Sequence, residues 1–235
     1  MQQFFCDQPL NIGSIYTFTK AQAHHARDVL KLHHETVRLV SGGEAFFADA
    51  YVNGSSFEAK VMEADKVDRE LRVDVTLAMA LIRREKFELV LQKATELGVN
   101  HILPFESSRC VVHAKKEKTD RWQAILQEAS EQCKRNRIPD LFLPVSFPDF
   151  DFDAYDCVLI PYEKEAGSGQ SILQQVHGHK ILIIIGPEGG FSPQEITSAT
   201  AKGAAAVSLG PRILRAETAA MYSLSVVGAW SEQTS

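Results

Sequence analysis

The sequence predicts an α/β protein with a parallel sheet, preceded by a small and mostly β domain. Three observations carry this prediction. Turn-forming residues divide the first 72 residues into short apolar runs, a strand–helix–strand pattern begins after Arg72, and two later strands each end in a Gly-Pro loop. The chain has 235 residues, 45% hydrophobic and 23% charged, which is a composition typical of folded globular proteins.

The expected N-terminal β domain covers residues 1–72. Gly13-Ser14, Ser41-Gly42-Gly43 and Asn53-Gly54 flank apolar runs, and Asn-Gly between such runs is typical of a hairpin. The expected strands are Thr36–Val40, Ala45–Val52 and Ser56–Met62, with one helix near Ala21–Leu32. Four histidines cluster near that helix, but adjacent pairs on a helix point in different directions, so we expect no metal site.

The expected α/β domain covers residues 73–235. Val73–Ile82 is apolar enough for a strand buried on both faces. Glu85–Leu97 has apolar residues at helical spacing and ends at Gly98, and a second apolar stretch, Val99–Pro104, follows it. A strand, a helix and a strand in this order predict a βαβ unit and therefore a parallel sheet.

The remaining elements follow from the same patterns. Thr119 is a candidate cap for a helix to about Arg137, on which Glu128, Gln132 and Arg135 share one face. The later expected elements are strands Cys157–Pro161, Ile181–Ile185 and Ala206–Leu209 and a last helix from about Glu217 to Trp230.

Several classes of protein are excluded. The longest purely aliphatic run is Ile181–Ile185, far below the roughly 20 residues that span a membrane, and the N-terminus does not resemble a secretory signal. The four cysteines show no C-x-x-C spacing, so we expect reduced thiols, no metal and a cytoplasmic protein.

The net charge of −5 is an average over segments of opposite sign. Residues 83–137 carry twelve basic and eight acidic side chains, a net charge of +4, whereas residues 138–235 have a net charge of −6. A basic cluster is the electrostatic pattern expected of a surface that binds a phosphate backbone. A solvated face with scattered salt bridges is the alternative.

The first motif that indicates chemistry is ILIIIGPEGGFSPQEI, residues 181–196. A buried strand ends in a glycine-rich loop, and the next helix is marked by Ser192 as cap, Pro193 and Glu195. Ligands of open α/β sheets bind beyond the carboxyl ends of strands, and glycines let the backbone approach them closely. Neither a P-loop nor a G-x-G-x-x-G pattern is present, so a nucleotide phosphate site is disfavoured. A plain tight turn is the other alternative.

The second motif is SLGPRILRAETAA, residues 208–220. Another Gly-Pro loop is followed by Arg212 and Arg215 and by a helix that opens with Glu217. A carboxylate in the first turn of a helix is stabilised by the helix dipole, which is a sufficient structural reason for Glu217. The small residues of the helix permit close packing, so packing could explain the helical part of this motif.

Together the two motifs resemble those of the SPOUT-superfamily methyltransferases, and most closely the small-subunit ribosomal RNA (uracil-N3)-methyltransferase family. Further matching residues occur along nearly the whole chain: Phe4-Phe5, His24-His25, Val29-Leu30, QKATELGV at 92–99, Arg109, Arg121-Trp122, EASEQ at 128–132, Arg135 and Pro139. The resemblance implies a PUA-like β-barrel at residues 1–72 that binds RNA and a SPOUT α/β domain with a trefoil knot at residues 73–235.

The resemblance also implies that the protein methylates N3 of a uridine in 16S ribosomal RNA, with S-adenosylmethionine as methyl donor, as a cytoplasmic homodimer without metal. For catalysis we expect Arg215 to stabilise charge on the uracil oxygens or bind a phosphate, and Glu163 or Glu188 to accept the proton. The expected donor-binding residues are Leu159, Ile160, Pro161, Gly186, Pro187, Glu188, Gly189, Gly190, Leu209, Gly210, Ile213, Leu214 and Thr218. The expected RNA-binding residues are Arg83, Arg84, Lys93, Arg109, Lys115, Lys116 and Arg135.

Other functions stay open from the sequence. These are a methyltransferase acting on another RNA position, a non-catalytic RNA-binding factor for ribosome assembly, and a nucleotide-binding enzyme. A salt bridge from Arg215 to Glu217 or Glu163 is the structural alternative to its catalytic role. The chain departs from the family pattern at Gln2-Gln3, at Lys31 and at His33-His34-Glu35.

Overall fold

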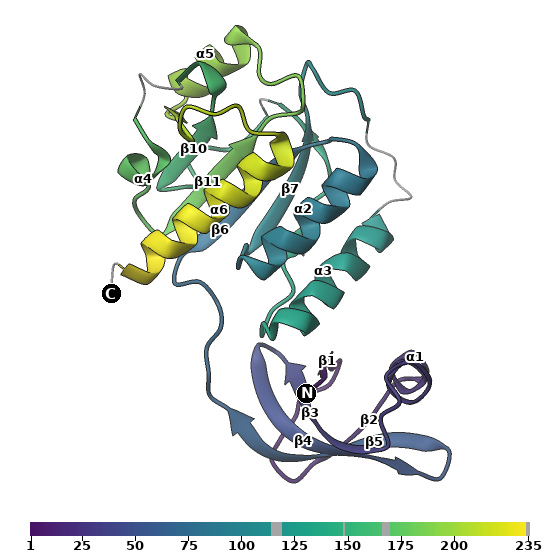
Figure 1. Ribbon diagram of the computed structural model, residues 1–235. Coiled ribbons are helices and arrows are strands. Elements are labelled where there is room, and N and C mark those ends of the chain that lie inside the picture. Colours follow the sequence, from purple (N-terminus) through teal and green to yellow (C-terminus); the bar gives the residue numbers. More distant parts are fainter. Residues whose placement is uncertain (114–118, 148, 166–169, 234–235) are drawn as a thin grey trace. The chain divides into compact units, whose positions relative to one another are not determined.

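The computed structural model describes residues 1–113, 119–147, 149–165 and 170–233 (Figure 1). The chain divides into two compact units. Unit 1 comprises Met1–Glu70 together with Ser130–Arg137, and unit 2 comprises Leu71–Ala129 and Ile138–Ser235. No described helix is long and apolar enough to cross a membrane.

Unit 1 is built on a five-stranded sheet in the order β1-β3-β4-β5-β2. Its strands are β1 (Gln3–Phe5), β2 (Ile15–Thr17), β3 (His34–Ser41), β4 (Glu44–Asn53) and β5 (Ser56–Asp65). The tight turns predicted at Gly42-Gly43 and Gly54 join the three long strands as antiparallel hairpins, with positive φ at all three glycines. The sheet curves around a core that contains Phe4, Phe18 and Phe57, as in a barrel-like domain (Figure 1).

Two expectations for helices differ from the structure. The helix expected at Ala21–Leu32 is a five-residue α1 (Lys20–His24) that continues as a π-helical turn over His25–Val29. α3 (Thr119–Cys133) ends before Arg137 because Lys134 adopts φ 66°, which leaves the helical region. Arg135 therefore does not share a helix face with Glu128 and Gln132.

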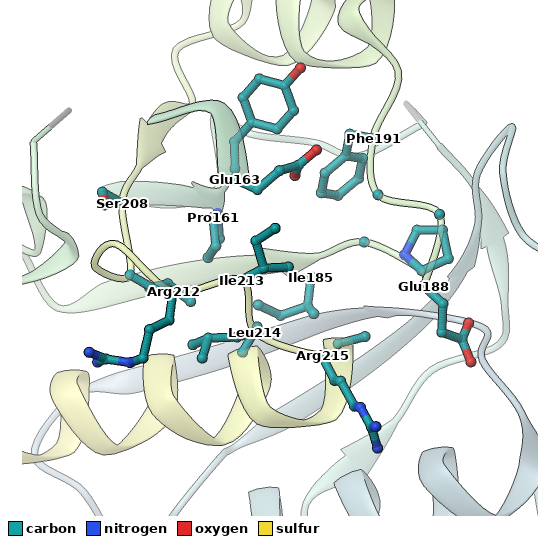
Figure 2. Close-up of a pocket in the computed structure, with 18 of the residues that line it drawn as sticks. Pro161, Glu163, Ile185, Glu188, Phe191, Ser208, Arg212, Ile213, Leu214 and Arg215 are labelled. Carbon is teal, nitrogen blue, oxygen red and sulfur yellow. The ribbon is translucent and has the colours of Figure 1, made fainter. Parts of the chain in front are cut away.

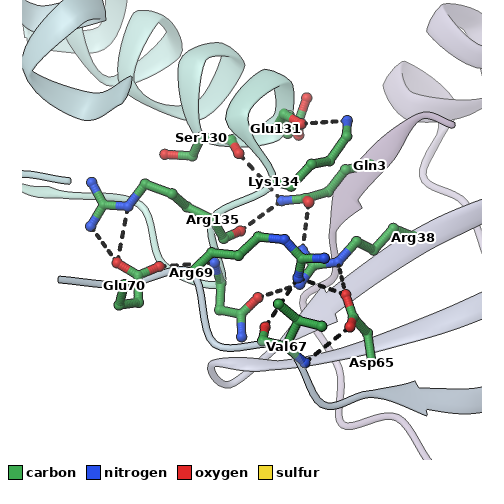
Figure 3. Close-up of polar contacts among 11 residues, drawn as sticks. Gln3, Arg38, Asp65, Val67, Arg69, Glu70, Ser130, Glu131, Lys134 and Arg135 are labelled. Carbon is green, nitrogen blue, oxygen red and sulfur yellow. Dashed lines mark hydrogen bonds and ion pairs between the residues drawn. The ribbon is translucent and has the colours of Figure 1, made fainter. Parts of the chain in front are cut away.

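A network of buried polar groups holds the 130–137 segment within unit 1 (Figure 3). The Arg38 side chain is fully buried and donates to Asp65 at 2.8 Å, to Gln3 at 2.6 Å and to Asn136. Gln3 donates in turn to the carbonyl of Arg135 at 2.8 Å. Burial raises the pKa of Asp65, but hydrogen bonds from Arg38 and others outweigh it and leave the pKa below its ordinary value. A buried charge without such partners would be strongly destabilising.

Unit 2 has a parallel sheet, as predicted, in the order β12-β10-β11-β6-β7-β8, with β9 also paired to β7. Its strands are β6 (Asp74–Ala80), β7 (His101–Glu106), β8 (Asp140–Leu141), β9 (Val145–Ser146), β10 (Cys157–Pro161), β11 (Lys180–Ile185) and β12 (Ala205–Val207). Every pairing between these strands is parallel.

Helices and loops cover both faces of this sheet (Figure 1). On one face α2 (Arg84–Glu96), α4 (Ile172–Gln175), α6 (Ala216–Gln233) and the unit 2 part of α3 pack against Leu77, Met79 and Ile183. On the other face α5 (Pro193–Ala201) and a cluster of phenylalanines, which includes Phe105, Phe150 and Phe191, cover Leu182 and Ile184. The central strands are buried on both sides, which explains their continuous apolar sequence.

One ion-pair cluster joins α2 to α3. Glu88 accepts hydrogen bonds from Arg121 at 2.7 and 2.8 Å and from Arg84 at 2.8 Å. Together these contacts lower the pKa of Glu88 from 4.5 to about 2: the hydrogen bonds from Arg121 have the largest effect, burial opposes them, and Arg84 adds to the lowering. The carboxylate of Glu88 therefore stabilises the folded state in its ionised form.

We expect this cluster to make stability depend on acid pH. Since the folded pKa lies below the unfolded one, the stabilisation is complete above about pH 4.5 and is lost as the pH falls toward 2. Glu88→Gln should lower the free energy of unfolding by on the order of 1 kcal/mol at pH 7, because both arginines are exposed. Urea unfolding between pH 7 and 3 should show the two proteins converging; a constant difference would contradict the assignment.

Candidate functional site

A pocket lies beyond the carboxyl ends of β10, β11 and β12 (Figure 2). It has a volume of about 600 Å³, within the range of small-molecule sites. Three segments line it, each beginning where one of these strands ends: 161–163, 185–191 and 208–216, with Ala219 of α6. The two motifs predicted from the sequence are thus brought together, although 22 positions separate Gly186 from Ser208.

Most residues expected to bind the donor line this pocket. They are Pro161, Gly186, Pro187, Glu188, Gly189, Gly190, Leu209, Gly210, Ile213 and Leu214. Leu159 and Ile160 lie further back in the buried strand β10, and Thr218 lies on the exposed side of α6, so these three are outside the lining. The candidate catalytic residues Glu163 and Arg215 also line the pocket, together with Tyr162 and Arg212.

The glycine-rich loop after β11 folds back on itself. The N–H of Gly190 donates to the carbonyl of Pro187 at 2.9 Å, and Gly190 has φ 65°, a conformation that favours glycine. A Cβ on Gly186 would lie 2.9 Å from the Phe191 ring, which is closer than real contacts allow. Ser192 caps α5 and Glu195 completes the capping box, as predicted. Main chain therefore forms much of this wall of the pocket.

The three candidate catalytic residues occupy different sides of the pocket. Figure 2 shows Arg215 and Glu188 pointing to the same side, toward α2, whereas Glu163 lies on the other side near Phe191. The carboxylate of Glu163 lies 3.4 Å from the position of a Cβ on Gly190. Within the described residues Arg215 has no ion pair, and Glu217 pairs instead with Lys86, with 3.4 Å between their charged atoms. The salt bridge considered for Arg215 is therefore not formed.

Lys86 is a charged residue of this site that the sequence did not single out. It lies in the first turn of α2, 4.0 Å from Glu188 and 3.4 Å from Glu217. The second oxygen of Glu217 is buried and has no hydrogen-bond partner among the described atoms. The only sequence feature that included Lys86 was the basic segment, because its partners lie about 100 residues or more away.

The expected RNA-binding residues have different surroundings. Arg83 is exposed at the N-terminal end of α2; Arg84 pairs with Glu88 and Lys93 with Glu96, both at 2.8 Å. Arg135 is 2% exposed and pairs with Glu70, so it stabilises unit 1 and does not face solvent. Arg109 donates to carbonyls of the glycine-rich loop. Lys115 and Lys116 lie outside the described residues. Within the described chain, no cluster of three or more His, Cys, Asp or Glu could hold a metal ion.

Comparison with known proteins gives the class of this site. The family model of the RNA methyltransferase domain matches residues 69–228, which include the whole pocket. Ribosomal RNA small subunit methyltransferase E of Bacillus subtilis is 31% identical, over 99% of this chain and 98% of that protein. The protein of the same name from Mesomycoplasma hyopneumoniae is 32% identical, over 96% and 98%.

Solved structures agree. A ribosomal RNA small subunit methyltransferase E from Neisseria gonorrhoeae, bound to S-adenosyl methionine, matches with a TM-score of 0.88 and 30% identity over 97% of both chains. A Legionella pneumophila methyltransferase in complex with SAM gives a TM-score of 0.86 and 32% identity, over 97% of this chain and 96% of that one.

The parallel sheet, its strand-end pocket and the matching family model define an RNA methyltransferase domain. Over its full length, the chain belongs to the ribosomal RNA small subunit methyltransferase E family.

The surroundings of two glycines, Gly186 in the loop after β11 and Gly228 in α6, predict opposite effects of alanine on stability. Gly186→Ala should lower the free energy of unfolding by about 1–3 kcal/mol, because its Cβ would press on the Phe191 ring. Gly228→Ala, inside α6 with a Cβ at 3.8 Å from Leu71, should raise it by up to about 1 kcal/mol. Thermal unfolding of both variants measures the change in the free energy of unfolding. An unchanged stability of Gly186→Ala would show that the loop accommodates the methyl group without cost.

Proposed function

We propose that this protein transfers a methyl group from S-adenosylmethionine to N3 of a specific uridine in 16S ribosomal RNA. The observation that carries the donor assignment is the pocket, whose residues come from the segments that the family resemblance predicts. It is supported by full-length relatives named as small-subunit methyltransferases and by the similar Neisseria structure bound to S-adenosyl methionine. The N3 position rests on the resemblance described above.

The residues of the pocket fit such a donor. A volume of about 600 Å³ suits a molecule of its size, and Gly186, Gly189 and Gly190 leave main-chain groups open to it. The carboxylates of Glu163 and Glu188, at either side of the pocket, favour a positively charged ligand. The donor supplies a sulfonium-activated methyl group, so the chain must position the acceptor and manage its proton.

Uracil N3 carries a proton at neutral pH, and its removal leaves negative charge on the flanking oxygens. In our proposal Arg215 stabilises that charge by hydrogen bonding, and Glu188 accepts the proton. We favour Glu188 because it points to the same side of the pocket as Arg215, whereas Glu163 lies near Phe191. Glu163 is the second candidate for the base.

The RNA would bind through exposed basic side chains and unit 1. Arg83 and Arg84 lie at the start of α2, close in sequence to Lys86, which contacts Glu188 of the pocket. Arg84 and Lys93 are weaker contributors because Glu88 and Glu96 pair with them, and Arg135 is no longer included because it is buried. Lys115 and Lys116 remain predicted contacts. We propose residues 1–72 as the PUA-like RNA-binding domain and residues 73–235 as the methyltransferase domain.

We also propose a cytoplasmic homodimer, without metal, in which the pocket lies near the interface. Ile213, in the pocket wall, is 88% exposed, and Tyr222 of α6 is 40% exposed, which is high for large apolar side chains. Thr218, Tyr222, Ser225 and Ala229 form one exposed face of α6. The trefoil knot that the resemblance implies remains a prediction.

Two alternatives give different results. A non-catalytic assembly factor would not bind the donor, and a methyltransferase with another target would leave the proposed uridine unmodified. Isothermal titration with S-adenosylmethionine tests the first. Mass spectrometry of ribosomal RNA from cells without the gene, searched for one missing 3-methyluridine, tests the second.

Arg215→Ala should reduce kcat for methylation of small subunits by about 10²–10³-fold, since a positioned charge is removed from the transition state. Glu188→Gln should reduce kcat, because the amide cannot accept the N3 proton, whereas Glu163→Gln should reduce kcat less. Steady-state assays with saturating donor and small subunits measure these effects. A wild-type kcat in Arg215→Ala would exclude the proposed role of Arg215. A larger loss of kcat in Glu163→Gln than in Glu188→Gln would assign the role of base to Glu163.

Removing RNA contacts should change salt dependence. Each phosphate contact contributes roughly 0.7–0.9 to the slope of log affinity against log salt concentration. Arg83→Met should therefore lower the slope by about that amount, and Arg135→Met should leave it unchanged if the variant folds, because Arg135 is buried. Filter binding with a 16S fragment at several salt concentrations measures both slopes.

A further inference from the structure

Arg109 lies in a turn that follows β7, outside the pocket lining. The turn is closed by a hydrogen bond from the N–H of Cys110 to the carbonyl of Ser107 at 3.1 Å. The side chain of Arg109 leaves this turn and reaches the glycine-rich loop, 80 residues later in the sequence. One nitrogen, Nη1, donates to the carbonyl of Gly189 at 2.9 Å and to that of Phe191 at 3.3 Å.

These two carbonyls flank Gly190, the residue with φ 65°. Both are main-chain acceptors of the loop that forms one wall of the pocket. A guanidinium keeps its charge at all physiological pH values, so its hydrogen bonds to carbonyls are charge-assisted and stronger than neutral ones. Arg109 therefore fixes the peptide orientations on both sides of the residue where the loop reverses.

The backbones of the turn and the loop are also in close approach. A Cβ on Gly189 would lie 3.3 Å from the Cβ of Arg109 and 3.6 Å from its carbonyl oxygen. A side chain at Gly189 would make a tight contact with Arg109 and displace it by a few tenths of an ångström.

A second contact joins the same two segments. One oxygen of Glu195 accepts from the N–H of Ser108 at 2.9 Å, and the other accepts from the N–H of Ser192 at 2.7 Å. Burial raises the pKa of Glu195, but these main-chain hydrogen bonds outweigh it and leave the pKa below its ordinary value. The turn at 107–110 is thus held to the glycine-rich loop by Arg109 and to the start of α5 by Glu195.

We propose that Arg109 is a positioning residue, which holds the Gly186–Phe191 loop in the conformation that binds the methyl donor, and that it is not an RNA contact. The inference rests on the proposed function and goes beyond it, because Arg109 does not itself line the pocket and contacts only main-chain carbonyls of the wall. If the loop adopts the binding conformation in only a fraction of the molecules, the apparent Kd of the ligand equals the intrinsic Kd divided by that fraction. Loss of Arg109 should therefore raise the donor Kd without changing how RNA phosphates are bound.

The test compares Arg109→Met with Arg83→Met, an exposed arginine at the start of α2. We expect Arg109→Met to raise the Kd for S-adenosylmethionine, measured by isothermal titration, by about tenfold, and to leave the salt slope of RNA binding unchanged. Arg83→Met should show the reverse pattern. An RNA-contact role for Arg109 predicts a lower salt slope and an unchanged donor Kd, and that result would overturn the inference.

A readout without ligand separates loop order from direct effects. Amide hydrogen exchange of the peptide that spans Gly186–Ser192 should be faster in Arg109→Met than in the wild type, and unchanged in Arg83→Met. Exchange at the wild-type rate in Arg109→Met would contradict a positioning role.

Two further variants keep the inference testable if Arg109→Met does not fold. Arg109→Lys keeps the charge but has one nitrogen on a differently shaped side chain, so we expect an intermediate donor Kd. Glu195→Gln keeps one acceptor oxygen and loses the other, which should weaken donor binding several-fold by loosening the second contact. Wild-type donor affinity in both variants would overturn the inference. Failure of the wild-type protein to bind the donor would instead contradict the proposed function.

Discussion

The site depends on one constraint. Where parallel strands end, the hydrogen bonding of the sheet stops, and the main-chain N–H and C=O groups that follow have no partner on a neighbouring strand. They must be satisfied by loops, by side chains or by a ligand. Here β10, β11 and β12 end side by side, and the glycine-rich loop after β11 turns sharply because Gly190 adopts φ 65°. Arg109 satisfies two carbonyls of that loop from outside, and Glu195 accepts from the N–H of Ser192, which follows it; residues of the loop line the pocket.

Features encoded within a few residues of each other could be predicted from the sequence. The strands β10 and β11 are almost entirely apolar because both faces are buried, and α2 ends before Gly98, whose φ is 90°. The capping box of α5 and the two glycine turns of unit 1 likewise follow from local rules. The position of the pocket was predictable for the same reason, since strand-end loops of a parallel sheet necessarily lie on one side.

Features that depend on distant partners could not be predicted. β1 pairs in parallel with β3, and the buried Arg38 meets Gln3, Asp65 and Asn136, which are far apart in the sequence. No local pattern distinguishes Arg38 from a surface arginine, because what keeps it buried is the set of acceptors that folding collects. The same holds for Arg135 with Glu70 and for Lys86 between Glu188 and Glu217.

Because ion pairs depend on distant partners, the charge of the basic segment at residues 83–137 does not show how many of its cations are available to bind RNA. A net charge of +4 over residues 83–137 counts every side chain equally, yet several of them are committed to carboxylates: Arg84 and Arg121 to Glu88, Lys93 to Glu96, and Arg135 to Glu70. Lys86 and Arg109 serve the pocket and its loop. A cation that pairs with a carboxylate of the same chain neutralises fewer RNA phosphates. It therefore releases few counterions when RNA binds and contributes little to the electrostatic part of the affinity. The segment's composition indicated a nucleic-acid partner, but in the structure most of its described cations pair with carboxylates of the chain or contact the glycine-rich loop.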